Sequence, residues 1–448
     1  MTTKPDARDE LKARGDAMSI ASGRETMMEL NGIKYRMPQP LSTGVMRTYK
    51  REYAQRQAYR VGAPVLFDFN TGTSYVEPQS ALLSFDLAIS NLTGDNRAWS
   101  WGSGLGGCSL FEEIRIISKN GVEIDRTQQA HVLAKVRADY TLSKESRTNL
   151  EMCDGYPSGS NFAVPAGTTR LFPITIPLKV LSGFFRPTVE AMLIPAGLAS
   201  GLRIEMILAS ASRAFQWEDG GTATAPVYEV QNPEILLQLT DLSDPVQSAL
   251  MKESAQTGLE YTFPSYFATV AGNSGSSQIT EQVKKAVSQA TRLFTAIYDK
   301  EGTFDVDRPG VDGFASIRAD RLGGFQYRVG SSYYPQQTVT RFTEMWATSN
   351  AAFDFIRKLE WSPNTVDFVG FSTGGKSLLS TSLETNDRLN LSGLPINNSS
   401  VAEFRFTQKD GTHNNGDGSD ATSSVDAVIF VEFIAVVKTS INRATLRI

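Results

Sequence analysis

The sequence has few of the residues that most catalytic and metal sites use. Its 448 residues include only two cysteines, Cys108 and Cys153, and two histidines, His131 and His413. Two cysteines cannot build a framework of several disulfides or a zinc site of four thiolates, and we expect both to be reduced thiols. General acid–base catalysis and metal binding draw most often on histidine, so its scarcity argues against an enzyme.

Long hydrophobic runs and a strong charge of one sign are also missing. The longest apolar stretch, residues 427–437, is interrupted by Glu432. It is too short to span a bilayer and predicts a strand buried on both faces. Residues 1–18 are charged and have no apolar core, so we predict no signal peptide. The net charge of -4 gives no support for a surface devoted to nucleic acid.

The length and composition of the chain suit two domains. A chain of 448 residues is comfortable as two halves of about 200 residues each. Glycine (36) and proline (19) are spread along it, as expected where turns join many short strands. Asp244 and Pro245 mark a helix start between the halves. We predict an N-terminal arm (1–60), a first domain (61–242), a linker helix (243–257) and a second domain with a C-terminal tail (258–448).

Strand patterns repeat through the first predicted domain. Residues 83–90 alternate apolar and polar side chains, which is the period of a half-buried strand. Asn120–Gly121 lies between two further apolar runs and predicts a hairpin. Residues 128–142 are expected to form a helix. Further strands are expected at 171–178, whose prolines favour an edge position, and at 202–208 and 234–239.

The second predicted domain repeats this pattern. Strands are expected at 261–270, 278–298, 325–329, 365–371, 403–407 and 425–438. A helix is expected at 338–355, where apolar residues share one face: Phe342, Met345, Trp346, Ala352 and Phe353. Helices do not alternate with strands, which disfavours a parallel α/β sheet. We therefore predict an all-β fold with a few short helices, built as two consecutive eight-stranded antiparallel jelly-roll β-sandwiches.

Basic residues concentrate in the predicted arm. Residues 34–60 contain seven lysines and arginines and a single acid, Glu52. Most such runs are solvated, and we favour that interpretation. The alternative is an arm that ties subunits together or contacts anionic material.

Three stretches carry a family resemblance. Residues 171–185 precede the strand at 202–208. Residues 325–337 contain Gly330-Ser-Ser-Tyr-Tyr-Pro335 and precede a helix, and residues 390–397 precede the strand at 403–407. Together they resemble the double jelly-roll major capsid proteins of icosahedral DNA viruses, over roughly residues 60–445.

The resemblance implies a structural protein and no enzyme. Members of the family are trimers whose six jelly rolls form a pseudo-hexagonal capsomer that tiles an icosahedral shell. The implied partners are two further copies of the chain, neighbouring capsomers, and minor capsid, cement and vertex proteins, with the basic arm towards the shell interior. The implied location is the virion capsid, made and assembled inside the host cell. No cofactor, metal or small-molecule substrate is implied.

One motif predicts a different function. Gly370, Gly375, Lys376 and Ser377 satisfy the phosphate-loop pattern, in which backbone N–H groups and a lysine bind phosphates and a serine holds magnesium. The motif should open a long helix, yet residues 378–390 are rich in serine and threonine. We interpret the match as coincidence and assign it no cofactor. A P-loop nucleotide-binding enzyme, with Glu432 as the partner acid, remains the alternative.

Weaker alternatives use other residues. Residues 370–374 also match a nucleophile elbow with His413 downstream, but the parallel sheet that it needs is not predicted. A two-domain β-sandwich carbohydrate-binding protein would use exposed aromatics: Trp99, Trp101, Tyr333 and Tyr334. The acidic loop 409–420 is a weak candidate for calcium, although such loops are usually solvated.

Overall fold

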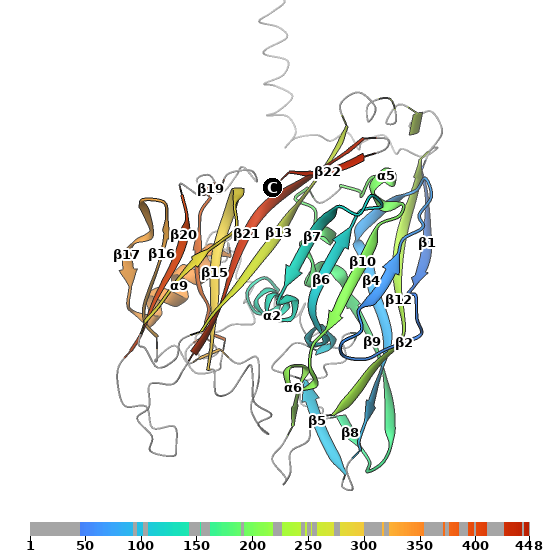
Figure 1. The fold of residues 1–448 in the computed structure, drawn as a ribbon, viewed down its shortest axis with the longest axis horizontal. Coiled ribbons are helices and arrows are strands. Elements are labelled where there is room, and N and C mark those ends of the chain that lie inside the picture. Colours follow the sequence, from blue (N-terminus) through green and yellow to red (C-terminus); the bar gives the residue numbers. More distant parts are fainter. Residues whose placement is uncertain are drawn as a thin grey trace, which may run out of the picture. The chain divides into compact units, whose positions relative to one another are not determined.

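The chain folds into two β-sandwiches, coloured blue to green and yellow to red in Figure 1. The computed structural model describes residues 45–92, 96–101, 106–142, 153, 162–189, 192–217, 226–242, 247–248, 252, 258–272, 278–299, 316–317, 322–353, 371, 376–384, 393–397, 400–409, 425–440 and 443–447. Among these residues, no helix has the length and apolar character needed to cross a bilayer.

The first sandwich packs two antiparallel sheets together. One has the strand order β1-β12-β4-β9, with β2 beside β12, and the other has the order β3-β10-β6-β7. Their bounds are β1 Val45–Tyr53, β2 Ala58–Tyr59, β3 Val65–Asp68, β4 Tyr75–Ser90, β6 Phe111–Ile117, β7 Glu123–Gln128, β9 Thr169–Pro177, β10 Arg203–Leu208 and β12 Val227–Leu242.

Smaller elements extend the first sandwich. A three-stranded sheet has the order β11-β5-β8, formed by β5 Arg97–Trp101, β8 Phe162–Val164 and β11 Phe215–Trp217. The helices are η2 Gly106–Leu110, α2 Ala130–Tyr140, α4 Leu178–Leu181, η3 Gly183–Phe185, α5 Ala196–Ala199 and α6 Ala211–Ala214.

The second sandwich also has two antiparallel sheets. One has the order β13-β21-β15-β18, with β19 beside β15 and β22 beside β21, and the other has the order β14-β20-β16-β17. The bounds are β13 Leu259–Gly272, β14 Gln278–Val283, β15 Val287–Asp299, β16 Leu322–Val329, β17 Ser332–Val339, β18 Leu379–Ser382, β19 Leu394–Ile396, β20 Ala402–Gln408, β21 Val425–Ser440 and β22 Arg443–Arg447, with helix α9 at Phe342–Ala352.

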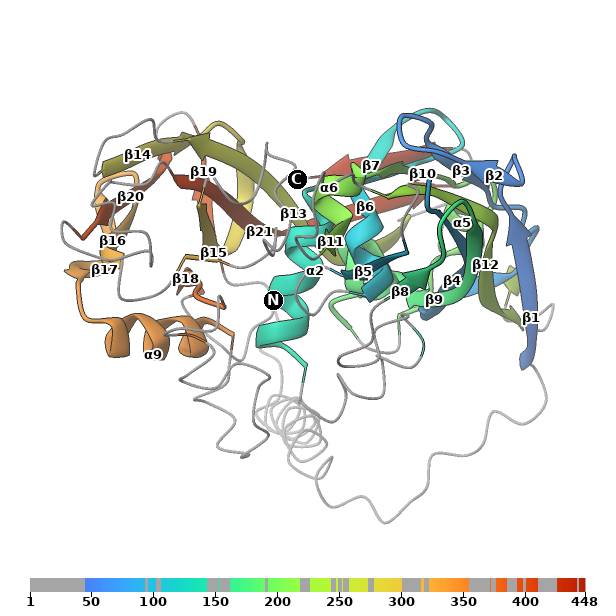
Figure 2. The ribbon, with the colours of Figure 1, turned by 90° about the horizontal axis from the view of Figure 1, so that it is seen from below.

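The two sandwiches share one topology. In each sandwich, the eight strands of the two four-stranded orders given above can be numbered along the chain, leaving out the smaller strands. One sheet then has the order first-eighth-third-sixth, and the other has the order second-seventh-fourth-fifth. In both, the longest helix (α2 or α9) lies between the fifth and sixth strands. Figure 2 shows α2 between the sandwiches and α9 beside the second one. The predicted pair of eight-stranded antiparallel sandwiches is confirmed.

Alternating patterns place the core as predicted. In β4, Leu83, Phe85, Leu87 and Ile89 are all buried and face the opposite sheet, whereas Ser84, Asp86 and Ser90 are partly exposed. In β21 the run Ala427–Val431 is buried completely. Because successive side chains of a strand point to opposite faces, the burial of five residues in a row shows that both faces of β21 are covered.

The predicted hairpin is confirmed, with a different turn. Strands β6 and β7 pair antiparallel, and the N–H of Gly121 donates to the carbonyl of Ser118 at 2.9 Å. Gly121 has a φ of 77°, but Asn120 does not take a positive φ. Because a type I′ turn needs positive φ at both central residues, the connection is not of that type.

The predicted arm ends earlier than residue 60. Val45–Tyr53 forms β1, which lies beside β12, so strand structure begins before residue 61. Basic side chains here pair with acids of β12: Arg51 Nη1 is 2.7 Å from Glu234 Oε1, and Arg60 Nε is 3.4 Å from Glu229 Oε1. Residues 1–44 and almost all of the predicted linker helix (243–257) lie outside the described residues.

The helix expected at 338–355 is shorter, and its predicted apolar face is buried except at its start. Strand β17 continues to Val339, and α9 begins at Phe342, which is exposed instead of buried. The buried residues of α9 are Met345, Ser349, Asn350 and Ala352. Ser349 lies in the core because its hydroxyl donates to the carbonyl of Leu378. The strand expected at 365–371 lies outside the described residues except for Phe371.

Candidate functional site: the junction between the two sandwiches

Lys376 of the phosphate-loop match lies where the sandwiches meet. Its Nζ is 3.5 Å from Oδ1 of Asp139 in α2, so the ion pair joins the second sandwich to the helix of the first. The hydroxyl of Tyr140 donates to the carbonyl of Lys376 at 2.7 Å. The lysine therefore helps to hold the junction together.

The rest of the motif does not have the context of a phosphate loop. The buried hydroxyl of Ser377 donates to the carbonyl of Ile317 at 2.5 Å, which satisfies a group that would have to bind magnesium. Strand β18 begins two residues later, where a phosphate loop requires a helix. Gly370 and Gly375 lie outside the described residues.

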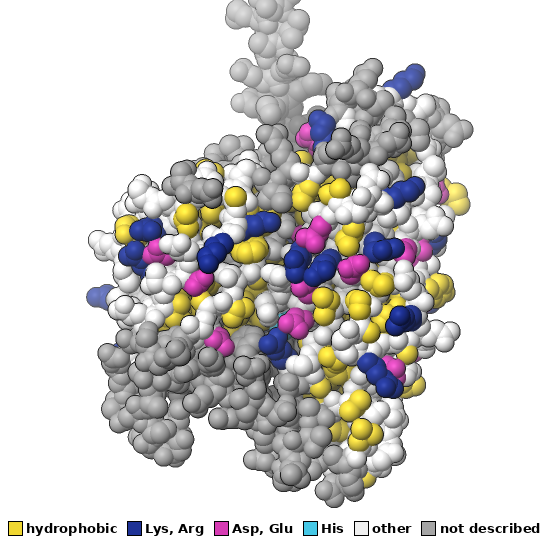
Figure 3. All heavy atoms as spheres, viewed as in Figure 1, with side chains coloured by type: hydrophobic (Ala, Val, Ile, Leu, Met, Phe, Trp, Pro, Cys, Tyr) yellow, Lys and Arg dark blue, Asp and Glu magenta, His cyan; other side chains and the backbone are white. Residues whose placement is uncertain are grey.

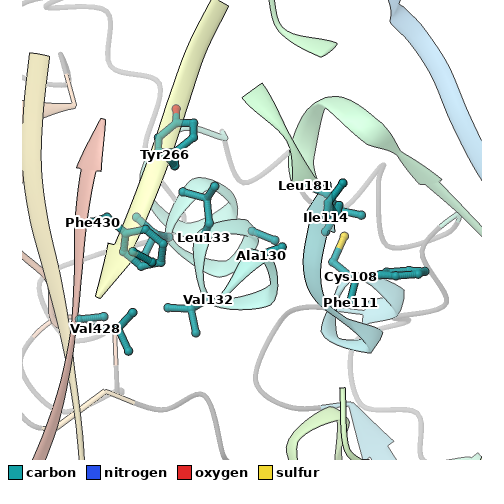
Figure 4. Packing of buried hydrophobic residues seen from close by; sticks show 14 of the residues in the cluster. Cys108, Phe111, Ile114, Ala130, Val132, Leu133, Leu181, Tyr266, Val428 and Phe430 are labelled. Atoms are coloured by element: carbon teal, nitrogen blue, oxygen red, sulfur yellow. The ribbon is translucent and has the colours of Figure 1, made fainter. Parts of the chain in front are cut away.

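Helix α2 fills the space between the sandwiches, and all eleven of its residues are buried. Figure 4 shows Val132 and Leu133 on its side towards the second sandwich, near Tyr266, Val428 and Phe430. Residues of the first sandwich lie on its other side: Cys108, Phe111, Ile114 and Leu181. One helix therefore belongs to the hydrophobic cores of both sandwiches.

Arg137 of α2 connects the two sandwiches through its guanidinium group. Nη1 donates to the carbonyls of Lys179 (2.8 Å) and Val180 (3.0 Å) in α4, and Nη2 donates to the hydroxyl of Tyr266 in β13 at 3.0 Å. The guanidinium carbon also lies 4.7 Å from the centre of the Tyr266 ring. A buried charge costs free energy unless it is hydrogen-bonded, so these contacts fix where α4 and β13 lie.

Asp125 of β7 forms a second polar connection. Its Oδ1 accepts from the hydroxyl of Ser265 in β13 at 2.6 Å, and its Oδ2 accepts from the hydroxyl of Ser182 at 2.8 Å. Burial raises the pKa of Asp125, and these hydrogen bonds oppose the rise only in part. The carboxyl group therefore ties β7 to β13.

A glycine allows the closest backbone approach at the junction. A Cβ atom added to Gly183 would lie 1.6 Å from the carbonyl oxygen of Pro264 in β13. Beside it, the hydroxyl of Tyr261 donates to the carbonyl of Phe184 at 2.6 Å, and the Phe184 ring packs against Phe263 with centroids 5.2 Å apart. Only a residue without a side chain fits between η3 and β13.

The outer surface of the junction carries charges of both signs. Figure 3 shows Lys, Arg, Asp and Glu side chains mixed over the centre of this face, where β6 and β7 lie in Figure 1. Glu113 accepts hydrogen bonds from Arg115 and Arg126. Burial raises the pKa of Glu113, but the two arginines outweigh it and leave the pKa below its usual value. A general acid needs a raised pKa, so this carboxylate suits an ion pair and not acid catalysis.

A groove of about 430 Å³ lies between the sandwiches. Its lining residues are Glu112, Glu113, Gln128, Gln129 and Phe267 to Val270. Glu112 is paired with Arg213 at 2.9 Å. In the ranges that the structure describes, no group of three or more His, Cys, Asp or Glu residues is placed to hold a metal ion.

Most of the other candidate residues that the structure describes are buried or paired, whereas Tyr333 in β17 is exposed. Trp99 and Trp101 are buried, so they offer no platform for a sugar. Glu432 pairs with Arg292 at 3.1 Å. Burial and the nearby charge of Arg213 lower the pKa of His131 to about 3. His413 and the loop 410–420 lie outside the described residues.

Sequence reasoning missed the residues that form the junction. Asp125 lies within a short strand of ordinary alternation, and Arg137 lies in a helix whose charges are typical of a solvated face. Gly183 offered a weak signal, because it interrupts the apolar stretch Val180–Phe185 in one of the segments that carry the resemblance.

No protein-family model matches the sequence, and no curated protein matches it. Solved structures do match. The PBCV-1 virus capsid model aligns with a TM-score of 0.60 and 10% identity, covering 92% of this chain and 98% of that one. The Faustovirus major capsid protein aligns with a TM-score of 0.60 and 10% identity, covering 97% and 98%. The fold is a double jelly roll.

A third structure, from the Sputnik virophage, aligns with a TM-score of 0.58 and 9% identity over 93% of this chain and 91% of that one. The resemblance predicted from short motifs is therefore confirmed at the level of the fold. Both jelly rolls are included in each alignment, because an alignment of this coverage cannot omit either one.

Proposed function

We propose that this double jelly roll is a structural subunit of an icosahedral virus capsid. The observation that carries the proposal is the alignment over more than nine tenths of both chains with the PBCV-1 capsid and the Faustovirus major capsid protein. The junction supports it, because residues that resembled a catalytic motif hold the jelly rolls together.

In this proposal the chain assembles as a homotrimer. Three copies supply six jelly rolls for a pseudo-hexagonal capsomer, and capsomers tile the shell of a DNA virus. The protein belongs to the virion capsid and is made and assembled in the host cell. Neighbouring capsomers, minor capsid, cement and vertex proteins are its partners, and residues 1–44, which precede β1, lie towards the shell interior.

The domain organisation that we propose follows the strands. The first jelly roll extends from Val45 to Leu242 and the second from Leu259 to the C-terminus, with the predicted linker between them. Because the junction is buried and hydrogen-bonded, the two jelly rolls act as one rigid building block.

Light scattering followed by electron microscopy of the same chromatographic peak tests the proposal. We expect a particle of about 147 kDa, three times the chain mass of 49.0 kDa, with a six-cornered outline. A monodisperse 49.0 kDa monomer that forms no larger particles under any ionic condition would overturn it.

A further inference from the structure

The shared topology makes some elements of the two jelly rolls equivalent. The junction inside the chain is built from the fifth strand and following helix of the first jelly roll (β7 and α2) and the first strand of the second (β13). Their equivalents are β17 and α9 in the second jelly roll and β1 in the first. Figures 1 and 2 show α9 and β1 on opposite sides of the pair of jelly rolls.

Helix α9 has the composition of a buried helix but is only partly covered. Helix α2 is entirely buried and carries Lys135, Arg137 and Asp139. Helix α9 has four buried residues out of eleven, yet its only charged side chain is Glu344. Phe342, at its start, is 43% exposed. Exposed helices are normally the more charged ones, so the reversal indicates that another molecule covers α9.

Strand β1 is likewise more exposed than its equivalent, strand β13 of the second jelly roll. In β13, Ser265 and Tyr266 are buried in the junction. In β1, Tyr49 is 72% exposed and Tyr53 is 69% exposed. By strand alternation they share a face with Arg47 and Arg51, which gives an Arg-Tyr-Arg-Tyr stripe. Arginine and tyrosine are enriched where protein interfaces are strongest.

Charge distinguishes the possible partners of this stripe. Arg51 is already 2.7 Å from Glu234, and acids of β12 neighbour the strand, which disfavours an anionic polymer. Glu344 on α9 is instead complementary to the arginines of β1. The surface that matches β1 is therefore present on the chain itself, but on the other jelly roll.

We infer that α9 and β17 of one copy dock onto β1 of a second copy and so repeat, between chains, the junction found within the chain. The inference rests on the proposed homotrimer and names its contact surfaces. Since the two surfaces differ and lie on opposite sides of one chain, each copy uses both, and the contacts close when the ring is complete. Three copies then make six similar junctions, three within chains and three between them.

Cysteine cross-linking in the full chain tests the contact. The background is Cys153→Ser, which removes the exposed thiol and keeps the buried Cys108. Tyr49→Cys and Phe342→Cys are combined in one chain and treated with a short bismaleimide. We expect bands of two and three chains on a denaturing gel. The matched control combines Leu171→Cys with Phe342→Cys, because Leu171 is 58% exposed on β9, at the opposite edge of the sheet that begins with β1.

The outcomes separate this inference from the proposed function. A particle of about 147 kDa that gives no cross-links, or gives them equally with the Leu171 control, overturns the contact but leaves the capsid subunit in place. A monomer in solution overturns both.

A disruptive variant provides an independent measurement. Tyr49→Glu with Tyr53→Glu should reduce the particle to the 49.0 kDa chain without changing the circular dichroism spectrum, because both side chains are exposed. Leu171→Glu should leave the trimer intact. A Tyr49→Glu, Tyr53→Glu protein that remains trimeric overturns the inference.

Discussion

Lys376 and Asp139 face each other across the junction of the two jelly rolls, with 3.5 Å between Nζ and Oδ1. Asp139 is also 3.2 Å from Lys135 within α2, so a single carboxylate accepts from both jelly rolls. This pair gives the lysine of the phosphate-loop match a physical role that needs no ligand.

Replacing Lys376 with alanine should reduce stability and affect no nucleotide. The pair is mostly shielded from solvent, so we expect a loss of about 1 kcal/mol in the free energy of unfolding. Chemical denaturation measures that loss, and calorimetric titration with ATP should show no heat of binding for either protein. Lys438→Ala is the control, because its ion pair with Glu260 is about half exposed and should contribute almost nothing. Saturable ATP binding lost in Lys376→Ala would restore the enzyme hypothesis.

Gly183→Ala should disrupt the junction by steric overlap. The new methyl group would lie 1.6 Å from the carbonyl oxygen of Pro264, which is backbone and cannot rotate away. We expect a loss of about 3 kcal/mol or more, seen as a lower melting temperature. Gly197→Ala in α5 is the matched control, since no atom lies within 4 Å of its added Cβ. Equal melting temperatures for the two variants would show that η3 and β13 are not in contact.

His131 should make the protein lose stability in mild acid. The pKa of His131 is about 3 in the folded state and 6.5 in the unfolded state. Between these two pH values the unfolded chain binds a proton at His131 and the folded chain does not. The stabilisation is complete above pH 6.5 and decreases as the pH falls towards 3. At pH 5 the loss should be about 2 kcal/mol. Melting temperatures of the wild type and His131→Gln between pH 5 and 7 measure it, and parallel curves would contradict the burial of a neutral imidazole.

Asp125 should act in the opposite direction. Burial raises the pKa of Asp125, so the folded state favours the protonated carboxyl group. As the pH rises and the carboxyl group ionises, the folded state is destabilised. The stability associated with the protonated form is complete below the unfolded pKa of 3.8 and is lost as the pH rises through the folded pKa. Asp125→Asn stays neutral and can still bond to Ser182 and Ser265. Its melting temperature relative to wild type should therefore increase from pH 4 upward and then level off. A constant difference would show that Asp125 is not the titrating group.

The strands were predictable because the signal for a strand is local. Leu83, Phe85, Leu87 and Ile89 alternate with smaller or polar residues, and that period alone places one face in the core. The apolar run of β21, interrupted only by Glu432, likewise predicted a strand buried on both faces. The early start of the first jelly roll was missed because β1 carries basic residues, and the acids that neutralise them are on β12, about 180 positions further along the chain.

The junction was not predictable because its contacts join distant segments. Lys135, Arg137 and Asp139 give α2 the appearance of a solvated helix, and only the second jelly roll supplies the partners that bury it. The prediction that Phe342 belongs to the buried face of α9 is wrong for a related reason. The apolar spacing of α9 gives no means of telling a face that packs within the chain from one that remains uncovered.

The pairing of the first and last strands in each jelly roll has a consequence for synthesis. Strand β12 lies between β1 and β4, so this sheet has a gap at its centre until the ribosome has released residues 227–242. In the second jelly roll, β21 joins β13 to β15 and comes almost at the end of the chain. Until its last strand is synthesised, each jelly roll therefore exposes unpaired strand edges. Contacts between segments so far apart in the sequence also form slowly. Protection from aggregation during translation is thus a requirement set by strand order, independent of the stability of the finished protein.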